Sequence, residues 1–81
     1  MNELRKKYNE IMENKNLWDD EESICELLQE KYPEYVKKAE EAQKSEEGEE
    51  YMSLSLSFIV DQFESEGDER IIKEIENFSA E

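Results

Sequence analysis

Several residue types on which enzymes depend are missing or rare in this chain. None of its 81 residues is a histidine, and only two, Gly48 and Gly67, are glycines. The absence of histidine removes the most common general base and metal ligand, together with the usual catalytic triads. Two isolated glycines cannot form the glycine-rich loop that binds the phosphates of a nucleotide. We therefore expect no enzymatic activity, no cofactor and no metal site.

Cysteine and long apolar runs are equally scarce. Cys25 is the only cysteine, so the chain cannot form an intramolecular disulfide, and a free thiol is typical of a reducing cytosol. Because Cys25 adjoins an apolar helical stripe, we expect a buried structural thiol rather than a redox switch. The longest apolar run is residues 58–60, whereas a transmembrane helix needs about 20 residues, and no hydrophobic signal segment begins the chain. These features predict a cytoplasmic protein that does not associate with membranes.

Positive charge is also in short supply. The chain has 10 basic and 24 acidic residues, which gives a net charge of −14. Such a balance excludes ordinary nucleic-acid binding, because a nucleic-acid-binding surface needs basic patches that neutralise phosphates. A basic protein is the natural partner for so acidic a surface. In a second interpretation, the acidity only keeps a small protein soluble.

What the chain does contain is a set of apolar stripes at helical spacing. Apolar residues make up 36% of the sequence and charged residues 42%, a balance that can indicate disorder. The apolar residues are nevertheless periodic and eight aromatic residues are present, which favours a folded core. The stripes are Leu4, Tyr8, Ile11 and Met12 in residues 2–14, then Ile24, Leu27 and Leu28, and finally Ile71, Ile72, Ile75 and Phe78.

Residues that start and stop helices divide the chain. Asp19 and Glu22 have the spacing of an N-cap and capping box, which predicts that a helix begins there. Pro33 ends that helix and suits the first position of the next one. Residues 40–50 are almost wholly polar, so we expect a fraying helix end followed by an exposed loop. Gly67 tolerates the left-handed conformation that closes a helix.

One segment has two possible periods. Residues 53–58 alternate polar and apolar side chains as a strand does, whereas Met52, Leu56, Ile59 and Phe63 share one helical face. Because no second strand is evident, we predict a central helix over residues 52–63. After Gly67, Asp68 is expected to cap the last helix. The overall expectation is an all-α fold, a compact bundle of four to five short helices in a single domain over residues 1–81.

The acidic residues are arranged in blocks that could form a binding surface. On a helix, acidic residues three or four positions apart lie about 5–6 Å from each other and can resemble a phosphate backbone. The first block is residues 19–22, which Trp18 adjoins, and the second is residues 46–50, which Tyr51 adjoins. Each of these two aromatic side chains is expected either to anchor a partner or to pack at the edge of the core. A third block spans residues 64–69. The candidate partner-binding residues are Trp18, Asp19, Asp20, Glu21, Glu22, Glu46, Glu47, Glu49, Glu50 and Tyr51.

Three segments carry a resemblance to a known group of proteins. Residues 27–35 (LLQEKYPEY) end in an aromatic-Pro-Glu corner, residues 57–60 (SFIV) are a central apolar segment, and residues 67–72 (GDERII) open an acidic closing helix. This order resembles the small acidic helical immunity proteins of bacterial toxin systems. Serines at positions 53, 55 and 57 depart from that pattern, and the Tyr-Tyr-Pro segment of colicin-type immunity proteins is absent. No binding residue is therefore transferred from that group.

The sequence leaves three functions open. The first is an inhibitor that binds a basic protein, most simply an immunity protein that covers the active site or substrate groove of a toxin nuclease. The second is a phage-encoded mimic of nucleic acid, such as an anti-restriction or anti-CRISPR protein, which needs the same acidic surface. The third is a helical adaptor or regulatory protein that dimerises through an apolar face. Gene neighbourhood distinguishes the first two, and the mass in solution tests the third.

Overall fold

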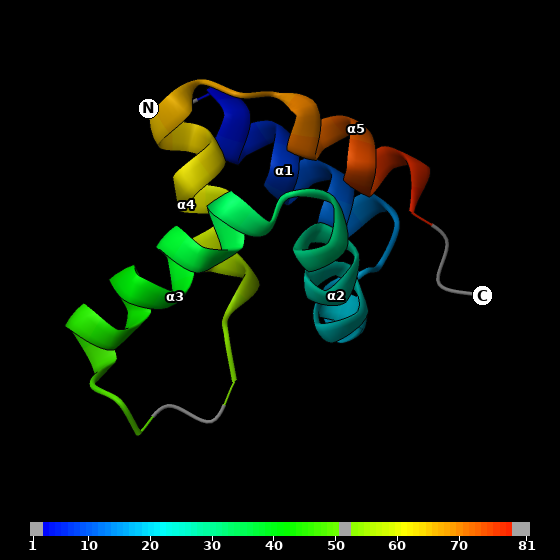
Figure 1. Cartoon of the computed structure of the whole chain (residues 1–81). Helices are drawn as coiled ribbons and strands as arrows, with labels where there is room; N and C mark the ends of the chain where they lie inside the picture. The colour runs from blue at the N-terminus through cyan, green and yellow to red at the C-terminus, as the bar shows by residue number, and fades with distance from the viewer. Residues whose placement is uncertain (1–2, 51–52, 79–81) are drawn as a thin grey trace.

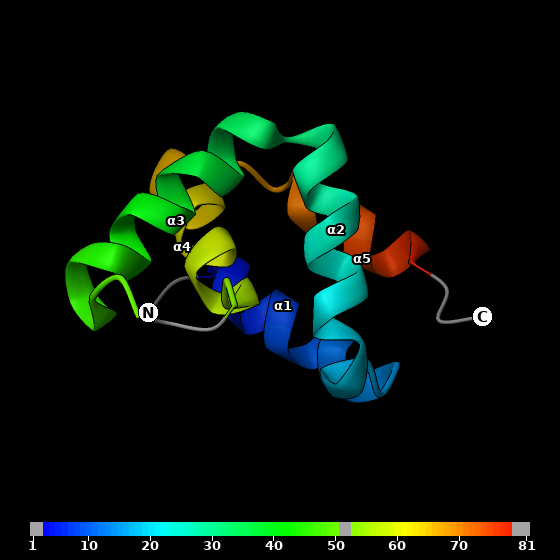
Figure 2. The same ribbon diagram turned by 60° about the horizontal axis from the view of Figure 1, so that its bottom comes forward.

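The computed structural model describes residues 3–50 and 53–78, and within these ranges it contains only helices and connections. The expected all-α bundle of short helices is confirmed (Figure 1). Helices α1 and α5 lie side by side, and α3 contacts α4 on the other side of the molecule (Figure 2). The elements are α1 (Glu3–Asn14), the 3₁₀ helix η1 (Trp18–Asp20), α2 (Glu21–Lys31), α3 (Pro33–Glu47), α4 (Leu56–Glu66) and α5 (Arg70–Asn77).

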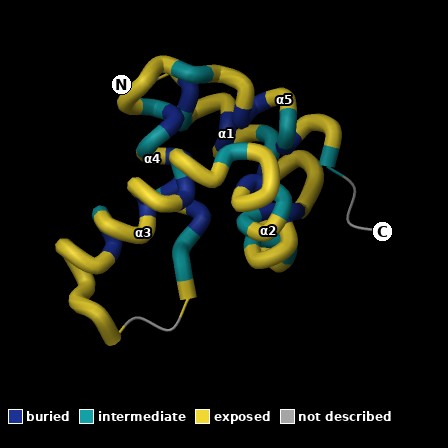
Figure 3. The backbone as a smooth tube through the Cα atoms, in the orientation of Figure 1, coloured by how far each residue is buried: buried dark blue, intermediate teal, exposed yellow. Residues whose placement is uncertain are grey.

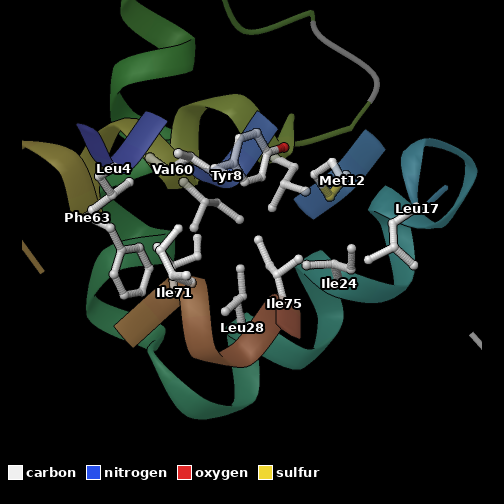
Figure 4. Close-up of a cluster of buried hydrophobic side chains, with 14 of the residues drawn as sticks. Leu4, Tyr8, Met12, Leu17, Ile24, Leu28, Val60, Phe63, Ile71 and Ile75 are labelled. Atoms are coloured by element: carbon white, nitrogen blue, oxygen red, sulfur yellow. The ribbon is translucent and has the colours of Figure 1, made fainter. Parts of the chain in front are cut away.

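Each α-helix contributes one apolar stripe to a shared core. The stripe of α1 is buried at Leu4, Tyr8 and Met12, as its spacing predicts. Phe63 of α4 is fully buried, and its ring lies between two tyrosines from the Pro33 corner. It stacks on Tyr35 at 4.0 Å between ring centroids and meets Tyr32 edge-on at 5.1 Å. Figure 4 shows these stripes converging from α1, α2, α4 and α5.

Two helix boundaries follow from residues with special backbone chemistry, and both predictions are confirmed. Pro33 is the first residue of α3, where its missing N–H costs nothing. Gly67 ends α4 in the left-handed conformation, with φ at 65°. Asp68 was expected to cap α5, and its Oδ1 atom does accept the N–H of Arg70 at 3.0 Å, although Glu69 stands between Asp68 and the first helical residue.

The predicted start of the second helix is wrong by one residue, because Asp20 and not Asp19 is the N-cap. Asp19 lies inside η1, and α2 begins at Glu21 without a side-chain hydrogen bond at its N-cap. Leu17 explains the shift, because its side chain is 2% exposed and anchors the connector in the core. The backbone then needs the short turn η1 before α2 can begin. The acidic residues at the start of α2 still favour the positive end of its dipole.

The predicted fraying of the helix end within residues 40–50 is also incorrect, whereas the exposed loop predicted after it is confirmed at residues 48–50. Helix α3 continues without interruption to Glu47 and stops at Gly48, where φ is 84°. A buried stripe extends through this polar half, because Ala39 and Gln43 continue the face that begins at Val36. The remaining positions of this half are mostly exposed, so the end of α3 projects from the body (Figure 3).

The central helix starts four residues later than predicted and continues to Glu66. Helix α4 begins at Leu56 rather than at residue 52, and residues 53–55 are not helical. Ser55 has extended backbone angles, and its hydroxyl accepts the N–H of Ser57 as an N-cap. Ser53 and Ser55 thus lie in the connection before α4, whereas Ser57 lies inside the helix, and Met52 lies outside the described residues. No helix in the described ranges combines the length and hydropathy that a membrane span requires.

Candidate functional site: an acidic cleft between α2 and α3

Three of the four basic residues in or directly after α1 make contacts within the fold. Arg5 forms an ion pair with Asp61 of α4, and Lys7 bonds to Glu69 at 3.3 Å. Lys15 donates its ammonium protons to three carbonyl oxygens at the end of α5, those of Ile75, Glu76 and Phe78, at 2.6–3.1 Å. A cation at this position satisfies terminal carbonyls and complements the helix dipole. These contacts tie α1 to α4 and α5.

A second set of polar contacts joins the Pro33 corner to α5. The Tyr35 hydroxyl donates to Asp68 at 2.8 Å, and the Arg70 guanidinium Nε donates to the same carboxylate at 2.9 Å. The Arg70 bonds hold the pKa of Asp68 well below its usual range. Similarly, Glu74 accepts bonds from Lys31 and from the Tyr32 hydroxyl.

Burial alone would raise the pKa of Glu74, but the bonds from Lys31 and Tyr32 outweigh burial and hold that pKa below its ordinary value. The pKa of Tyr32 is raised, first by burial and then by its bond to Glu74. Burial followed by the bond to Asp68 raises the pKa of Tyr35 in the same way. These side chains form a structural network in which each carboxylate has a nearby cation.

The other side of the molecule has a cleft whose acidic residues have no such cations. The cleft lies between α2, α3 and residues 53–55, and its volume is about 430 Å³. Its apolar lining comes from Cys25, Val36 and Leu54. Four carboxylate side chains line it as well, three from α2 and one from α3, namely Glu21, Glu22, Glu26 and Glu40. Within the described residues none of these four makes an ion pair.

The thiol of Cys25 reports the local environment of this cleft. Burial, followed by the negative charges of Glu21 and Glu22, raises the pKa of Cys25 to about 11. The thiol lies 3.9 Å from the carbonyl oxygen of Leu54 and is half-buried. Such a thiol is protonated at neutral pH and is a poor nucleophile. Cys25 is thus part of the wall of the cleft, and it is less buried than the sequence predicted.

Residues 53–55 form one side of the cleft because Gln43 holds them there. The Gln43 side-chain amide donates to the carbonyl oxygen of Ser53 at 3.1 Å and accepts the N–H of Ser55 at 2.9 Å. Gln43 is only 2% exposed, and its amide also donates to Glu47. The amide therefore takes the place of a neighbouring strand for this extended segment.

The structure separates the predicted site residues into two groups. Glu21 and Glu22 line the cleft, and Asp19 and Asp20 precede them in η1. Trp18 is 41% exposed and packs edge-on against Tyr8, with ring centroids 6.3 Å apart, so it lies outside the core. The second group, Glu46, Glu47, Glu49 and Glu50, is exposed at the far end of α3, away from the start of α2 in both ribbon views (Figures 1 and 2). Tyr51 lies outside the described residues.

Three residues of the site were missed at the level of sequence. Glu26 and Glu40 were not singled out, because Glu26 stands alone and Glu40 has only Glu41 beside it, so neither lies in one of the acidic blocks. The signal that could have found them is the distribution of lysine and arginine, since residues 16–30 contain six acidic residues and no basic residue. Gln43 gave no signal at all, because a glutamine within a polar helical run is ordinarily exposed.

Two further observations constrain the chemistry of this surface. Across residues 3–50 and 53–78, no group of three or more acidic or cysteine side chains is arranged to hold a metal ion. No protein-family model, curated protein or solved structure matches the chain. The site must therefore be interpreted from its own geometry and charge.

Proposed function

We propose that the protein is an inhibitor that binds a basic protein through the cleft and the acidic residues beside it. In this role it covers the active site or substrate groove of its partner. The resemblance to immunity proteins makes a toxin nuclease the first partner to test, because a nuclease presents a basic surface to its own substrate. Direct binding of nucleic acid is opposed by the net charge of −14.

The unequal distribution of charge is the observation that carries this proposal. Arg5, Lys7 and Lys15 are bonded to α4 or α5, and Lys31 and Arg70 are bonded near the Pro33 corner. The carboxylates of the cleft have no equivalent partners among the described residues. A surface of one sign focuses the electrostatic field and accelerates encounter with an oppositely charged protein.

Trp18 supplies an apolar contact next to this acidic surface. Its ring is exposed at the start of the acidic segment, and contact with the buried Tyr8 ring limits its orientations. A pre-oriented aromatic side chain loses little conformational entropy on binding and is a common hot spot at protein interfaces. We expect Trp18→Ala to speed dissociation mainly, while the melting temperature falls by only a few degrees.

Association kinetics provide the test. The partner is first captured from the native host with the immobilised protein and identified by mass spectrometry, and inhibition of its activity is then measured. Removing four charges at Asp19, Asp20, Glu21 and Glu22 with Asn and Gln should slow association at least about tenfold at low salt. The matched control removes four exposed carboxylates that make no ion pair in the described part of the chain, Glu3, Glu10, Glu13 and Glu76, and should change the rate by less than about threefold.

Salt dependence is the expected result, and two other results would contradict the proposal. Screening over about 8 Å at physiological ionic strength should make association of the wild type steeply dependent on salt. If both four-residue variants associate as fast as the wild type, the acidic surface serves only solubility. If the captured partner remains fully active in the complex, the protein binds without inhibiting and occlusion is wrong.

A further inference from the structure

The cleft between α2 and α3 combines two kinds of lining that suit one type of side chain. Leu54, Val36 and the protonated thiol of Cys25 make part of its wall apolar. Carboxylates stand on both helical sides, with Glu26 on α2 and Glu40 on α3. A ligand that fits this lining has an apolar stem and a cationic head, which is the description of a lysine or arginine side chain.

Other occupants match the cleft less well. A bare metal ion gains nothing from Leu54 and Val36, and the described carboxylates are not grouped as metal ligands. A partner helix is about 10–12 Å across with its side chains, so one turn of it occupies roughly 400–600 Å³. A single turn would therefore already fill the cleft of about 430 Å³. An anion is repelled by four carboxylates that make no ion pair among the described residues, and no basic side chain lines the cleft.

We infer that the cleft is a socket for a single lysine or arginine side chain of the basic partner. Its methylene groups lie against Leu54 and Val36, and its charged head lies between Glu26 and Glu40. The inference rests on the proposed function, since it names the feature of the basic partner that the cleft recognises. Gln43 is a positioning residue for this socket, because it holds the Ser53–Ser55 side in place.

Small cations test the socket without the partner. The probes are Nα-acetyl-lysine methylamide, the uncharged norleucine analogue with a similar stem, and methylammonium, which has the charge without the stem. Backbone amide shifts in a nitrogen–proton NMR titration should move in residues 21–26, 36–40 and 53–55 on addition of the lysine derivative. Norleucine and methylammonium should each bind at least about threefold more weakly, because each lacks one half of the match.

A matched pair of variants separates the socket from general negative charge. Glu26→Gln with Glu40→Gln should weaken binding of the lysine derivative about fivefold. Glu30→Gln with Glu41→Gln removes the same charge from the same two helices outside the cleft and should leave affinity within about twofold. Thermal melts of both variants verify folding. Equal affinities of the two variants, or shifts spread evenly over the acidic end of α3, would overturn the socket.

The same variants keep this inference distinct from the proposed function. If the captured partner binds with salt dependence but the lysine derivative leaves the cleft amides unmoved, the socket is wrong and the proposed function stands. If the lysine derivative occupies the cleft but no basic protein binds, the socket stands and the proposed function is wrong. If both hold, Glu26→Gln with Glu40→Gln should also weaken partner binding more than the control pair does.

Discussion

Replacing Gln43 by leucine tests the contact that shapes the cleft. Leucine fills a similar volume but leaves the carbonyl of Ser53 and the N–H of Ser55 without their side-chain partner. A buried orphaned group costs about 1–3 kcal/mol, and water can reach Ser53 because that residue is exposed. Most of the cost therefore comes from Ser55, and we expect a loss of about 2 kcal/mol in the free energy of unfolding. For a domain of this length that loss lowers the melting temperature by about 8–16 °C.

Urea denaturation followed by circular dichroism measures this change directly. Lys44→Leu is the control, because it adds the same side chain to the next, exposed position of α3 and should cost less than about 0.5 kcal/mol. A loss below about 0.5 kcal/mol for Gln43→Leu would refute the reasoning, since the amide would then not be holding residues 53–55.

Gln43→Glu tests the same contact through the pH dependence of stability. The ionised carboxylate could still accept the N–H of Ser55, but it would face the Ser53 carbonyl and Glu47 with no proton to donate. Its folded pKa should therefore exceed the unfolded value of about 4.3, so the penalty is absent below that pH and grows as the pH rises. The difference in melting temperature from the wild type should be larger at pH 7 than at pH 4.

Three further predictions concern other parts of the molecule. The pKa of Asp68 is depressed in the folded state, so its contribution to the free energy of unfolding is present above the unfolded pKa of about 4 and is lost as the pH falls. Asp68→Asn should therefore cost about 1–2 kcal/mol at pH 7. Urea melts should show the difference in stability between the variant and the wild type shrinking in acid. With a pKa of about 11, Cys25 should react with iodoacetamide at pH 8 at least about a hundredfold more slowly in the folded than in the urea-unfolded protein, and equal rates would place it on the surface. Raising NaCl from low to moderate concentration should increase the melting temperature, because screening the excess carboxylates outweighs weakening of exposed pairs such as Lys7–Glu69; a fall would show that the ion pairs dominate.

The parts of the fold that were predicted correctly depend on local chemistry. Pro33 lacks an N–H and Gly67 accepts a positive φ, so each marks a boundary whatever surrounds it. The stripe of α1 is similarly visible, because helical geometry alone places Leu4, Tyr8 and Met12 on one face. These signals need no knowledge of the rest of the molecule.

The incorrect boundaries depend on contacts that sequence spacing does not contain. Asp19 has the chemistry of an N-cap, but burial of Leu17 moves the start of α2 to Glu21. The polar half of α3 remains helical because residues 53–55 cover one side of it through Gln43. The helical periodicity of residues 52–63 correctly indicated a helix, but the helix begins only at Leu56, because Ser55 is its N-cap.

The candidate site shows the same division between local and long-range information. In the sequence, the acidic blocks at residues 19–22 and 64–69 look equivalent. In the fold they differ, because Lys7 reaches Glu69 from 62 residues away and Arg70 bonds to Asp68, whereas no described base reaches the cleft. Only the folded chain determines which carboxylates remain available to a partner.

The uncompensated carboxylates have a thermodynamic consequence for the free protein. Glu21, Glu22 and Glu26 repel Glu40 across the cleft, so this charge opposes the packing of α2 against α3. A cation held between the two helices removes that repulsion, and it can do so only in the folded state. If the proposed basic partner binds there, its binding and the folding of the chain are linked, and a partner at a concentration 100 times its dissociation constant would stabilise the fold by about 2.7 kcal/mol. The arrangement that weakens the isolated bundle is the one from which the proposed partner would gain its binding energy.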